Sequence, residues 1–290
     1  MTTSTTQTVT EELRRWIVAQ AEAGCRPEDV LAAMKSSGWD EDVAIEAMEN
    51  TLRQRLDELG KRPATVAALP AASKVPEPAV GDASIITLSD GHAVKVLSSM
   101  RLPRVVVFGH LMTDDECVQL MALAAPRLAR SETVDNATGG SEINAARTSD
   151  GMFFERGEAP LIRRIEARIA ELLRWPVENG EGLQILRYRP GAEYRPHFDY
   201  FDPQHPGTAR ILERGGQRVG TLVMYLNTPD GGGATTFPDV GLEVAPVRGN
   251  AVFFSYDRAD TSTRTLHGGA PVTAGEKWVA TKWLREGVFV

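Results

Sequence analysis

The segment Tyr194–Phe201 contains two side chains that are well suited to bind a metal ion. His197 and Asp199 are two residues apart, and in a β-strand residues i and i+2 point to the same face. Their imidazole and carboxylate would therefore converge on one point and provide two ligands. A third ligand is needed, and the chain has five histidines. His267 is the best candidate, because it stands in a Leu-His-Gly-Gly stretch next to a strand-like run.

Two histidines and one carboxylate form the ligand set typical of mononuclear Fe(II) sites that keep coordination positions open. An isolated His-x-Asp pair supports such a site only weakly, since two polar residues in a loop give the same pattern. The motifs that accompany the pair are therefore more informative. In chain order they are Arg147-Thr-Ser149-Asp-Gly151-Met-Phe153, Leu183-Gln-Ile-Leu-Arg-Tyr188, Tyr194-Arg-Pro-His197-Phe-Asp199-Tyr200-Phe201, Tyr225-Leu-Asn227, Gly232-Gly-Ala-Thr235-Thr-Phe237-Pro238, His267-Gly-Gly269-Ala-Pro271-Val272 and Gly275-Glu-Lys277-Trp278.

This ordered set of motifs resembles the prolyl 4-hydroxylase branch of the 2-oxoglutarate/Fe(II) dioxygenases, over roughly residues 100–286. The resemblance implies a double-stranded β-helix, or jelly roll, that binds Fe(II). It implies 2-oxoglutarate as co-substrate, O2 as oxidant and ascorbate as reductant. The expected reaction hydroxylates a proline of a protein or peptide while 2-oxoglutarate is decarboxylated to succinate and CO2.

The resemblance also assigns roles to individual residues. The catalytic residues that it implies are His197, Asp199, His267 and Lys277, and the first three of these are the metal ligands. Lys277 would bind the distal carboxylate of 2-oxoglutarate, and the other positions expected near this co-substrate are Tyr225, Tyr188, Thr235 and Trp283. The positions that match the peptide groove of the family are Arg147, Ser149, Glu181, Tyr194 and Arg218.

Lys277 has a physical reason for its expected role that is independent of the resemblance. On a strand it shares one face with Val279 and Trp283. If that face is buried, the ammonium must be paired with an anion, and an exterior lysine that lays its stem over a neighbour is the alternative. Alternation also places Tyr225 on one strand face with Thr221 and Val219.

Two departures from the family pattern leave the substrate open. Arg285 stands where related enzymes often have a histidine two residues after the last tryptophan, and the loop 202–217 is longer than in the shortest relatives. One alternative is the same chemistry on another amino-acid residue or on a free amino acid, and 3- versus 4-hydroxylation is also open. An alternative of a different class is a non-catalytic jelly-roll protein that holds metal as a sensor or adaptor. Lys277 and Tyr225 argue against that class, because a metal binder needs no carboxylate pocket.

Composition restricts the class of protein. The chain has 290 residues and a formal net charge of -7, with a pI near 5.4, which argues against a non-specific nucleic-acid binder. No apolar run is long enough to span a membrane, and the first residues do not resemble a signal peptide. Cys25 and Cys117 are far apart in sequence and are expected as reduced thiols, which favours the cytoplasm.

The pattern along the chain predicts three parts. Residues 8–60 read as a small all-α domain of three helices, with a faint similarity to ubiquitin-associated bundles. We expect Trp16 and Trp39 in its core, although a partner- or substrate-recruiting surface is the alternative. The Pro/Ala-rich residues 61–82 are predicted as a linker. Residues 83–290 would then form the catalytic domain.

The catalytic part alternates short strands with Gly/Pro turns, which is typical of an all-β core, here with flanking helices and hence of the α+β class. The extended runs that we predict are 183–188, 218–226, 242–245, 251–256 and 277–284. The apolar stripe over residues 158–175 predicts an amphipathic helix that covers one face of a sheet. The polar stretch 131–153 is long for a connection, and such loops are often functional lids.

Overall fold

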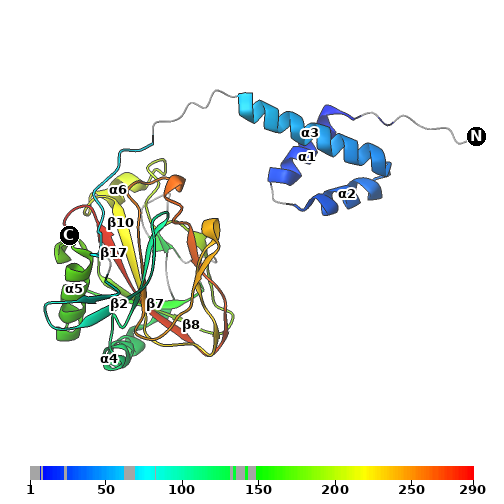
Figure 1. Cartoon of the computed structure of the whole chain (residues 1–290). Coiled ribbons are helices and arrows are strands. Elements are labelled where there is room, and N and C mark those ends of the chain that lie inside the picture. Colours follow the sequence, from blue (N-terminus) through cyan, green and yellow to red (C-terminus); the bar gives the residue numbers. More distant parts are fainter. Residues whose placement is uncertain are drawn as a thin grey trace, which may run out of the picture. The chain divides into compact units, whose positions relative to one another are not determined.

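The computed structural model describes residues 7, 9–22, 25–61, 69–81, 83–130, 133–134, 141–142 and 148–290. The chain divides into two compact units, residues 1–69 and residues 70–290, which are drawn in Figure 1. Within the described residues, no helix combines the length and the apolar character that crossing a bilayer requires.

The N-terminal unit is a bundle of three helices. They are α1 (Glu11–Glu22), α2 (Pro27–Ser36) and α3 (Glu41–Lys61). Helix α3 begins after Asp40, whose carboxylate accepts hydrogen bonds from the N–H groups of Asp42 and Val43, as expected of an N-cap residue. The small core contains one or two side chains from each helix, namely Ile17, Met34, Ala44 and Ala47.

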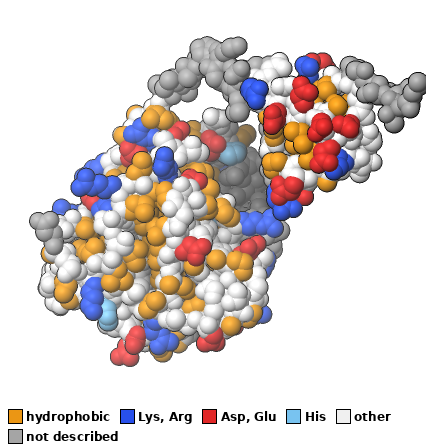
Figure 2. Space-filling model, turned by 45° about the vertical axis from the view of Figure 1, so that its right-hand side comes forward, with side chains coloured by type: hydrophobic (Ala, Val, Ile, Leu, Met, Phe, Trp, Pro, Cys, Tyr) orange, Lys and Arg blue, Asp and Glu red, His pale blue; other side chains and the backbone are white. Residues whose placement is uncertain are grey.

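The prediction that Trp16 lies in this core is wrong, because its side chain is 37% exposed. The neighbouring Ile17 occupies the core position instead, and one step along a helix turns a side chain by about 100°. Trp39 is partly buried against the core, as predicted. The bundle also gathers acidic side chains on the face shown in Figure 2. The first turn of α3 contains two acidic residues, Glu41 and Asp42.

Residues 70–81, here called the strap, pack against the second unit. Glu77 accepts hydrogen bonds from Arg104 at 3.0 and 3.1 Å, and its own N–H donates to the carbonyl of Leu173. Pro76 is buried, and a Cβ at Gly220 would come within 2.8 Å of its ring. Half of the segment predicted as a linker is therefore an ordered part of the second unit, while residues 62–68 and 82 lie outside the described residues.

The second unit contains two antiparallel sheets. The nine-stranded major sheet has the order β1-β2-β3-β14-β10-β17-β8-β7-β4, and the four-stranded minor sheet has the order β13-β12-β15-β9. The strands of the major sheet are β1 (Ile85–Thr87), β2 (Ala93–Met100), β3 (Arg104–Gly109), β4 (Ala129–Arg130), β7 (Asp150–Phe154), β8 (Leu183–Tyr188), β10 (Arg218–Tyr225), β14 (Ala251–Ser255) and β17 (Lys277–Arg285). Those of the minor sheet are β9 (Tyr194–His197), β12 (Thr235–Phe237), β13 (Leu242–Val244) and β15 (His267–Gly269), and two further pairs are β5 (Thr133–Val134) with β6 (Ser141–Glu142) and β11 (Gly231–Gly232) with β16 (Val272–Ala274).

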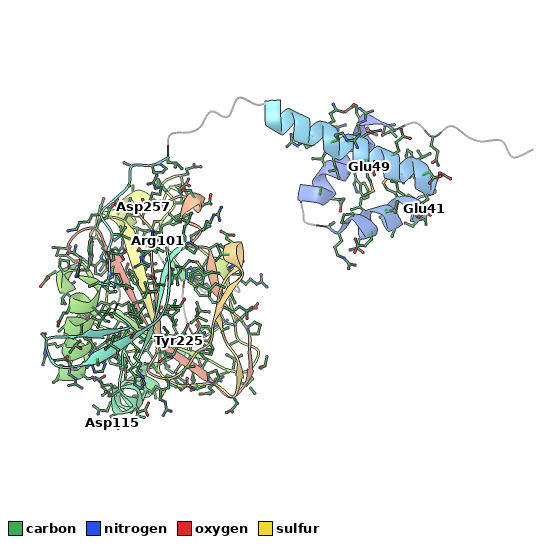
Figure 3. The ribbon with its side chains drawn as sticks, viewed as in Figure 1. Glu41, Glu49, Arg101, Asp115, Tyr225 and Asp257 are labelled. Carbon is green, nitrogen blue, oxygen red and sulfur yellow. The ribbon has the colours of Figure 1, made fainter. Side chains whose placement is uncertain are left out.

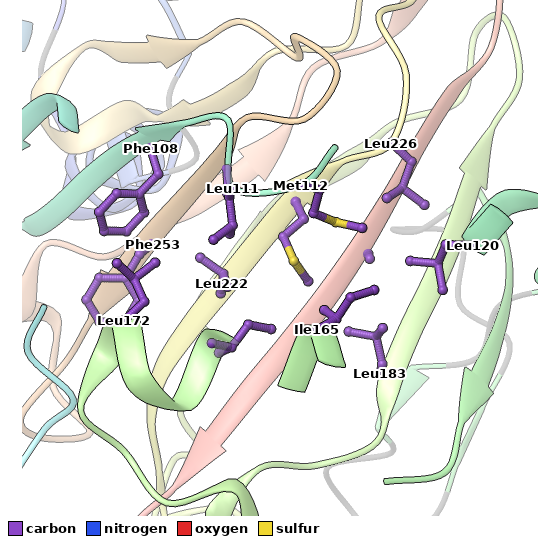
Figure 4. Close-up of a cluster of buried hydrophobic side chains, with 14 of the residues drawn as sticks. Phe108, Leu111, Met112, Leu120, Ile165, Leu172, Leu183, Leu222, Leu226 and Phe253 are labelled. Carbon is purple, nitrogen blue, oxygen red and sulfur yellow. The ribbon is translucent and has the colours of Figure 1, made fainter. Parts of the chain in front are cut away.

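Each face of the major sheet has its own core, because successive side chains of a strand point to opposite faces. In β14, Phe253 belongs to an outer core under helices α4 (Asp114–Ala124) and α5 (Pro160–Leu173), while Phe254 belongs to an inner core shared with the minor sheet. Figure 4 shows the outer core, in which Ile165 of α5 packs near Leu222 and Leu183. Two facing sheets with helices on one side confirm the predicted jelly-roll core with flanking helices, and the functional cavity lies between the sheets.

Most predicted strands of this unit occur within one residue of the expected bounds. The stretch 131–153, however, is not all loop, because β7 begins at Asp150 and pairs with β8. Most of the rest of that stretch lies outside the described residues. The short helix α6 (Thr208–Leu212) lies within the loop 202–217.

A buried ion pair attaches helix α5 to strand β17. Lys282 Nζ lies 2.6 Å from Glu166 Oε1, both side chains are 2% exposed, and Lys282 also donates to the carbonyl of Glu181. A buried pair stabilises little by itself, but loss of one partner leaves an uncompensated charge. The pair thus fixes the outer face of the strand whose inner face carries Lys277.

We expect the strap to contribute to the stability of the second unit. A fragment of residues 70–290 should fold alone, and a fragment that begins at residue 83 should lose about 2 to 4 kcal/mol of unfolding free energy. The reason is the loss of the buried Pro76 and Pro78 and of the packing of Val75 and Val80 on the outer core. Urea unfolding of both fragments measures this difference, and equal midpoints and slopes would show that the strap only rests on the surface.

Candidate metal centre

Three side chains converge at one end of the space between the two sheets. In the ladder between β9 and β15, His267 lies directly opposite His197, and Asp199 follows β9 by two residues. The Asp199 carboxylate places Oδ1 3.5 Å from His197 Nε2 and Oδ2 3.5 Å from His267 Nε2. Among the described residues, these three form a group of ligand atoms that all lie within 4.8 Å of one another.

Hydrogen bonds to the backbone set the tautomers of both imidazoles. His197 Nδ1 lies 2.8 Å from the carbonyl of Arg195, and His267 Nδ1 lies 3.0 Å from that of Thr265. A carbonyl oxygen only accepts, so each Nδ1 carries the hydrogen and each Nε2 presents its lone pair to the centre. Burial lowers the pKa of His267 to about 4, against the opposing effect of Asp199. This imidazole is therefore neutral, and able to bind a metal, at neutral pH.

Asp199 is ionised at all relevant pH values. Its burial would raise the pKa, but His267, His197 and Arg218 outweigh that effect and hold the pKa well below its usual range. The hydroxyl of Thr221, on β10 of the opposite sheet, donates a 2.7 Å hydrogen bond to Oδ2.

These donors fit a single Fe(II) ion. Two ligand atoms that each lie about 2.1 Å from one ion can be up to about 4.2 Å apart, and the 3.5 Å separations meet this limit. Two neutral imidazoles and one carboxylate are the donor set of the facial triad. The protein thus provides three ligands on one side of the ion and leaves the cavity side open.

The ligands form one end of a cavity whose walls come from both sheets. Its lining contains most of the predicted site residues together with several small and apolar ones. The lining residues are Leu186, Tyr188, Tyr194, His197, Asp199, Thr221, Val223, Thr235, His267, Gly268, Gly269, Lys277, Val279, Thr281 and Trp283.

Lys277 provides an unpaired cation in this cavity. Its side chain is 4% exposed, and no carboxylate of the described residues pairs with it. Its Nζ lies 5.5 Å from the ring centre of Tyr188, its partner in the β17–β8 ladder, and 5.8 Å from that of Tyr225. Burial lowers the pKa of Lys277 to about 8. A buried ammonium without a counter-ion is costly, so the site fits a ligand carboxylate such as that of 2-oxoglutarate.

Of the other predicted co-substrate residues, Tyr225 and its partner Thr235 lie near this lysine, whereas Trp283 lies further along β17, opposite Thr221. Tyr225 is fully buried inside the unit (Figure 3) and donates a 2.8 Å hydrogen bond to Thr235 Oγ1. Trp283 lines the far wall under the guanidinium of Arg218, 4.0 Å away, and its buried indole N–H has no hydrogen-bond partner within the described residues.

The predicted substrate residues are placed differently from one another. Tyr194 lines the cavity and stacks on His197, with ring centres 3.7 Å apart. Ser149 is buried, and Arg147 lies outside the described residues. Glu181 and Arg218 do not line the cavity, because they form an ion pair at 2.7 Å behind Trp283.

Arg285, noted as a departure from the family pattern, joins this pair. It donates to the same Glu181 oxygen at 2.7 Å and to the carbonyl of Gly216. Coulombic attraction and hydrogen bonds from both arginines outweigh the burial of Glu181 and lower its pKa. The roles predicted for these residues in peptide binding stay predictions.

Sequence reasoning missed Thr221 as a residue of the site, although strand alternation with Tyr225 had placed it on the correct face. It also placed Val219 on that face, which is wrong. Val219 packs in the outer core with Leu222, because the β10–β17 ladder shifts register between Arg218 and Gly220. Such a bulge reverses the side-chain alternation beyond it, and the sequence pattern does not reveal it.

The chain is similar to a known family of enzymes. Residues 183–285 match the model of the 2OG-Fe(II) oxygenase superfamily. Over 203 residues the chain is 41% identical to Prolyl 4-hydroxylase 5 of Arabidopsis thaliana, and the aligned region covers 63% of this chain and 68% of that protein. Over 201 residues it is 42% identical to Prolyl 4-hydroxylase 1 of the same plant, and that aligned region covers 63% of this chain and 69% of the relative. A solved structure of the viral collagen prolyl hydroxylase from Paramecium Bursaria Chlorella virus-1 in complex with 2OG is 28% identical, covers 62% of this chain and 95% of that one, and has a TM-score of 0.49.

We expect the affinity for 2-oxoglutarate to depend on pH through Lys277. The charged ammonium binds the carboxylate, and burial lowers its pKa to about 8 in the free protein. Above that pH the free protein loses the charge, so the dissociation constant should rise by about tenfold per pH unit. Calorimetric titration with Mn(II) in place of iron, between about pH 7 and about pH 9.5, measures this slope.

Lys277→Arg is the matched control, because a guanidinium stays charged over the whole range. Its absolute affinity is expected to fall, but the dependence on pH should disappear. A dissociation constant that is flat with pH in the unaltered protein would contradict the role given to Lys277.

Proposed function

Because the chain belongs to the 2OG-Fe(II) oxygenase superfamily, with prolyl 4-hydroxylases as relatives, we propose that it hydroxylates proline residues of a protein or peptide. The single observation that supports this most is the arrangement of two separate binding sets in one cavity. His197, Asp199 and His267 form a metal triad. Lys277, which pairs with no carboxylate of the described residues, stands apart from it on the opposite sheet. A site that only stores metal has no use for the second set.

When bound, Fe(II), 2-oxoglutarate and O2 supply the oxidising chemistry, in which one oxygen atom enters the substrate C–H bond and the other enters succinate as CO2 leaves. The protein positions the participants. Lys277 binds the distal carboxylate, and the Tyr225 hydroxyl is held close by through Thr235. The apolar wall of Leu186, Val223 and Val279 excludes water from this end of the cavity.

The open side of the cavity suits an apolar substrate ring. Tyr194, already stacked on His197, and Trp283 both line the cavity. A pyrrolidine ring between aromatic faces buries apolar area without an unsatisfied donor, since a proline nitrogen within a chain carries no hydrogen.

The proposal predicts turnover that depends on proline. With Fe(II), 2-oxoglutarate and ascorbate, a proline-rich peptide should gain about 16 Da per turnover on proline, and succinate should form in equal amount. The same peptide with alanine in place of each proline should yield only a small background of succinate. Mass spectrometry with fragment-ion assignment measures both, and His267→Ala, which removes a metal ligand, should lower both to background.

The pattern of products also separates the alternatives. If another residue, or only a free amino acid, is hydroxylated, proline is not the substrate but the protein is still an oxygenase. Metal binding without succinate under any condition would instead favour a sensor or adaptor.

We further propose that the N-terminal bundle recruits protein substrates. The exposed Trp16 and Ile45, the latter within the acidic first turns of α3, support a binding surface. Removal of residues 1–69 should leave kcat/KM for a short peptide unchanged and lower it for a full-length protein substrate. An equal loss of kcat/KM on both substrates, or no loss on either, would contradict the recruiting role. The 70–290 fragment described above is the folded protein for this comparison.

A further inference from the structure

A chain of two hydrogen bonds extends from the metal site into the major sheet. Thr221 Oγ1 donates to Asp199 Oδ2 at 2.7 Å and lies 2.9 Å from the hydroxyl of Tyr256. All three residues are buried, with Tyr256 2% exposed. Tyr256 directly follows β14, the neighbour of β10 that carries Thr221. The function described above uses neither hydroxyl.

The direction of both hydrogen bonds follows from the donor inventory. An ionised carboxylate only accepts, so Thr221 uses its single hydrogen for Asp199. The hydrogen between Thr221 and Tyr256 must then come from the phenol. Burial raises the pKa of Tyr256 well above its usual value, and the nearby Asp199 raises it further. The phenol therefore keeps its hydrogen, and the two bonds polarise each other along the chain.

Asp199 needs this support more than the two histidines do. His197 and His267 are paired within a strand ladder, and each ring has a hydrogen bond to a backbone carbonyl. Asp199 lies beyond the end of β9, outside the ladder. Its carboxylate is held instead from the opposite sheet, by Thr221.

Tyr256 is itself rigidly placed. Its N–H donates to the carbonyl of Val219 at 3.1 Å. Its ring packs at 6.2 Å on Phe254 and, edge to face, at 6.2 Å on Tyr200. A fixed phenol can therefore fix the orientation of the Thr221 hydroxyl, which otherwise rotates to suit its partner.

We propose that Tyr256, acting through Thr221, is a positioning residue that keeps one oxygen of Asp199 occupied and so directs a single oxygen to the metal. A carboxylate that binds through one oxygen takes one coordination position, whereas a chelating carboxylate takes two. The pair thus keeps positions free for the two oxygens of 2-oxoglutarate and for O2. This inference rests on the Fe(II) site of the proposed function, but not on proline as the substrate.

The test measures metal binding without any substrate. The metal-free protein is titrated with Mn(II) by calorimetry, and the Co(II) complex is examined by its visible absorption, which reports coordination number. Thr221→Val, which has nearly the same shape but no hydroxyl, should weaken Mn(II) binding by about 10- to 100-fold and alter the Co(II) spectrum. Tyr256→Phe should weaken binding by a smaller factor, of about three- to tenfold, and change the spectrum in the same sense.

The double variant gives the decisive comparison. If Tyr256 acts only through Thr221, then Thr221→Val combined with Tyr256→Phe should bind Mn(II) as weakly as Thr221→Val alone. Thr221→Ser, which restores the hydroxyl, should recover affinity near that of the unaltered protein. Tyr200→Phe removes a phenol hydroxyl next to the same ring and should change nothing. Thermal unfolding of each metal-free variant identifies any that fails to fold, and Tyr256→Phe and Thr221→Ser still decide the question if Thr221→Val is lost.

Additive losses in the double variant, or unchanged Mn(II) affinity and Co(II) absorption in Tyr256→Phe, would overturn the proposal. The metal titrations contain no proline peptide. If they give the expected Mn(II) results but no peptide is hydroxylated, the assignment of proline as the substrate is rejected and the positioning role of Tyr256 stands.

Discussion

The register between strands β9 and β15 is the constraint on which the site depends. His267 stands directly opposite His197 in this ladder, so the backbone places two imidazoles on one face within bonding reach of one ion. A shift by one residue would move one ring to the opposite face. Glycine at 268 permits the close approach, because a Cβ there would lie 2.9 Å from the carbonyl of Tyr194. The metal site is thus a consequence of strand pairing before any metal binds.

The second determinant is the contrast between two lysines of strand β17. Lys282 faces the outer core, where Glu166 neutralises it at 2.6 Å. Lys277, an odd number of residues away, faces the cavity and has no such partner among the described residues. A protein selected only for stability would pair or replace the second lysine as well. The unpaired charge destabilises the empty site and is offset only when an anion enters, so it is best explained by ligand binding.

Different parts of this architecture were predictable to different degrees, for physical reasons. The spacing of His197 and Asp199 was sufficient to place them on one face. The alternation of short extended runs with Gly/Pro turns gave the bounds of the central strands. The context of His267 already made it the best candidate for the third ligand, but its position directly opposite His197 could not be predicted, because contacts between distant strands leave no periodic signal. The same limit explains why Thr221 was missed as the hydrogen-bond donor to Asp199, and why the strap was predicted to be part of a linker. Local irregularities account for the remaining errors, such as the bulge that turns Val219 outward.

The charges around the cavity explain why a dianion is the natural partner of this site. Lys277 is a buried cation in the cavity wall. Of the buried carboxylates, Glu181 is shared by Arg218 and Arg285, and Asp199 is taken by the metal centre. A divalent metal adds further positive charge in a region with little water to screen it. A ligand with two carboxylates, one at the metal and one at Lys277, relieves both excesses at once, whereas a neutral ligand of the same size relieves neither.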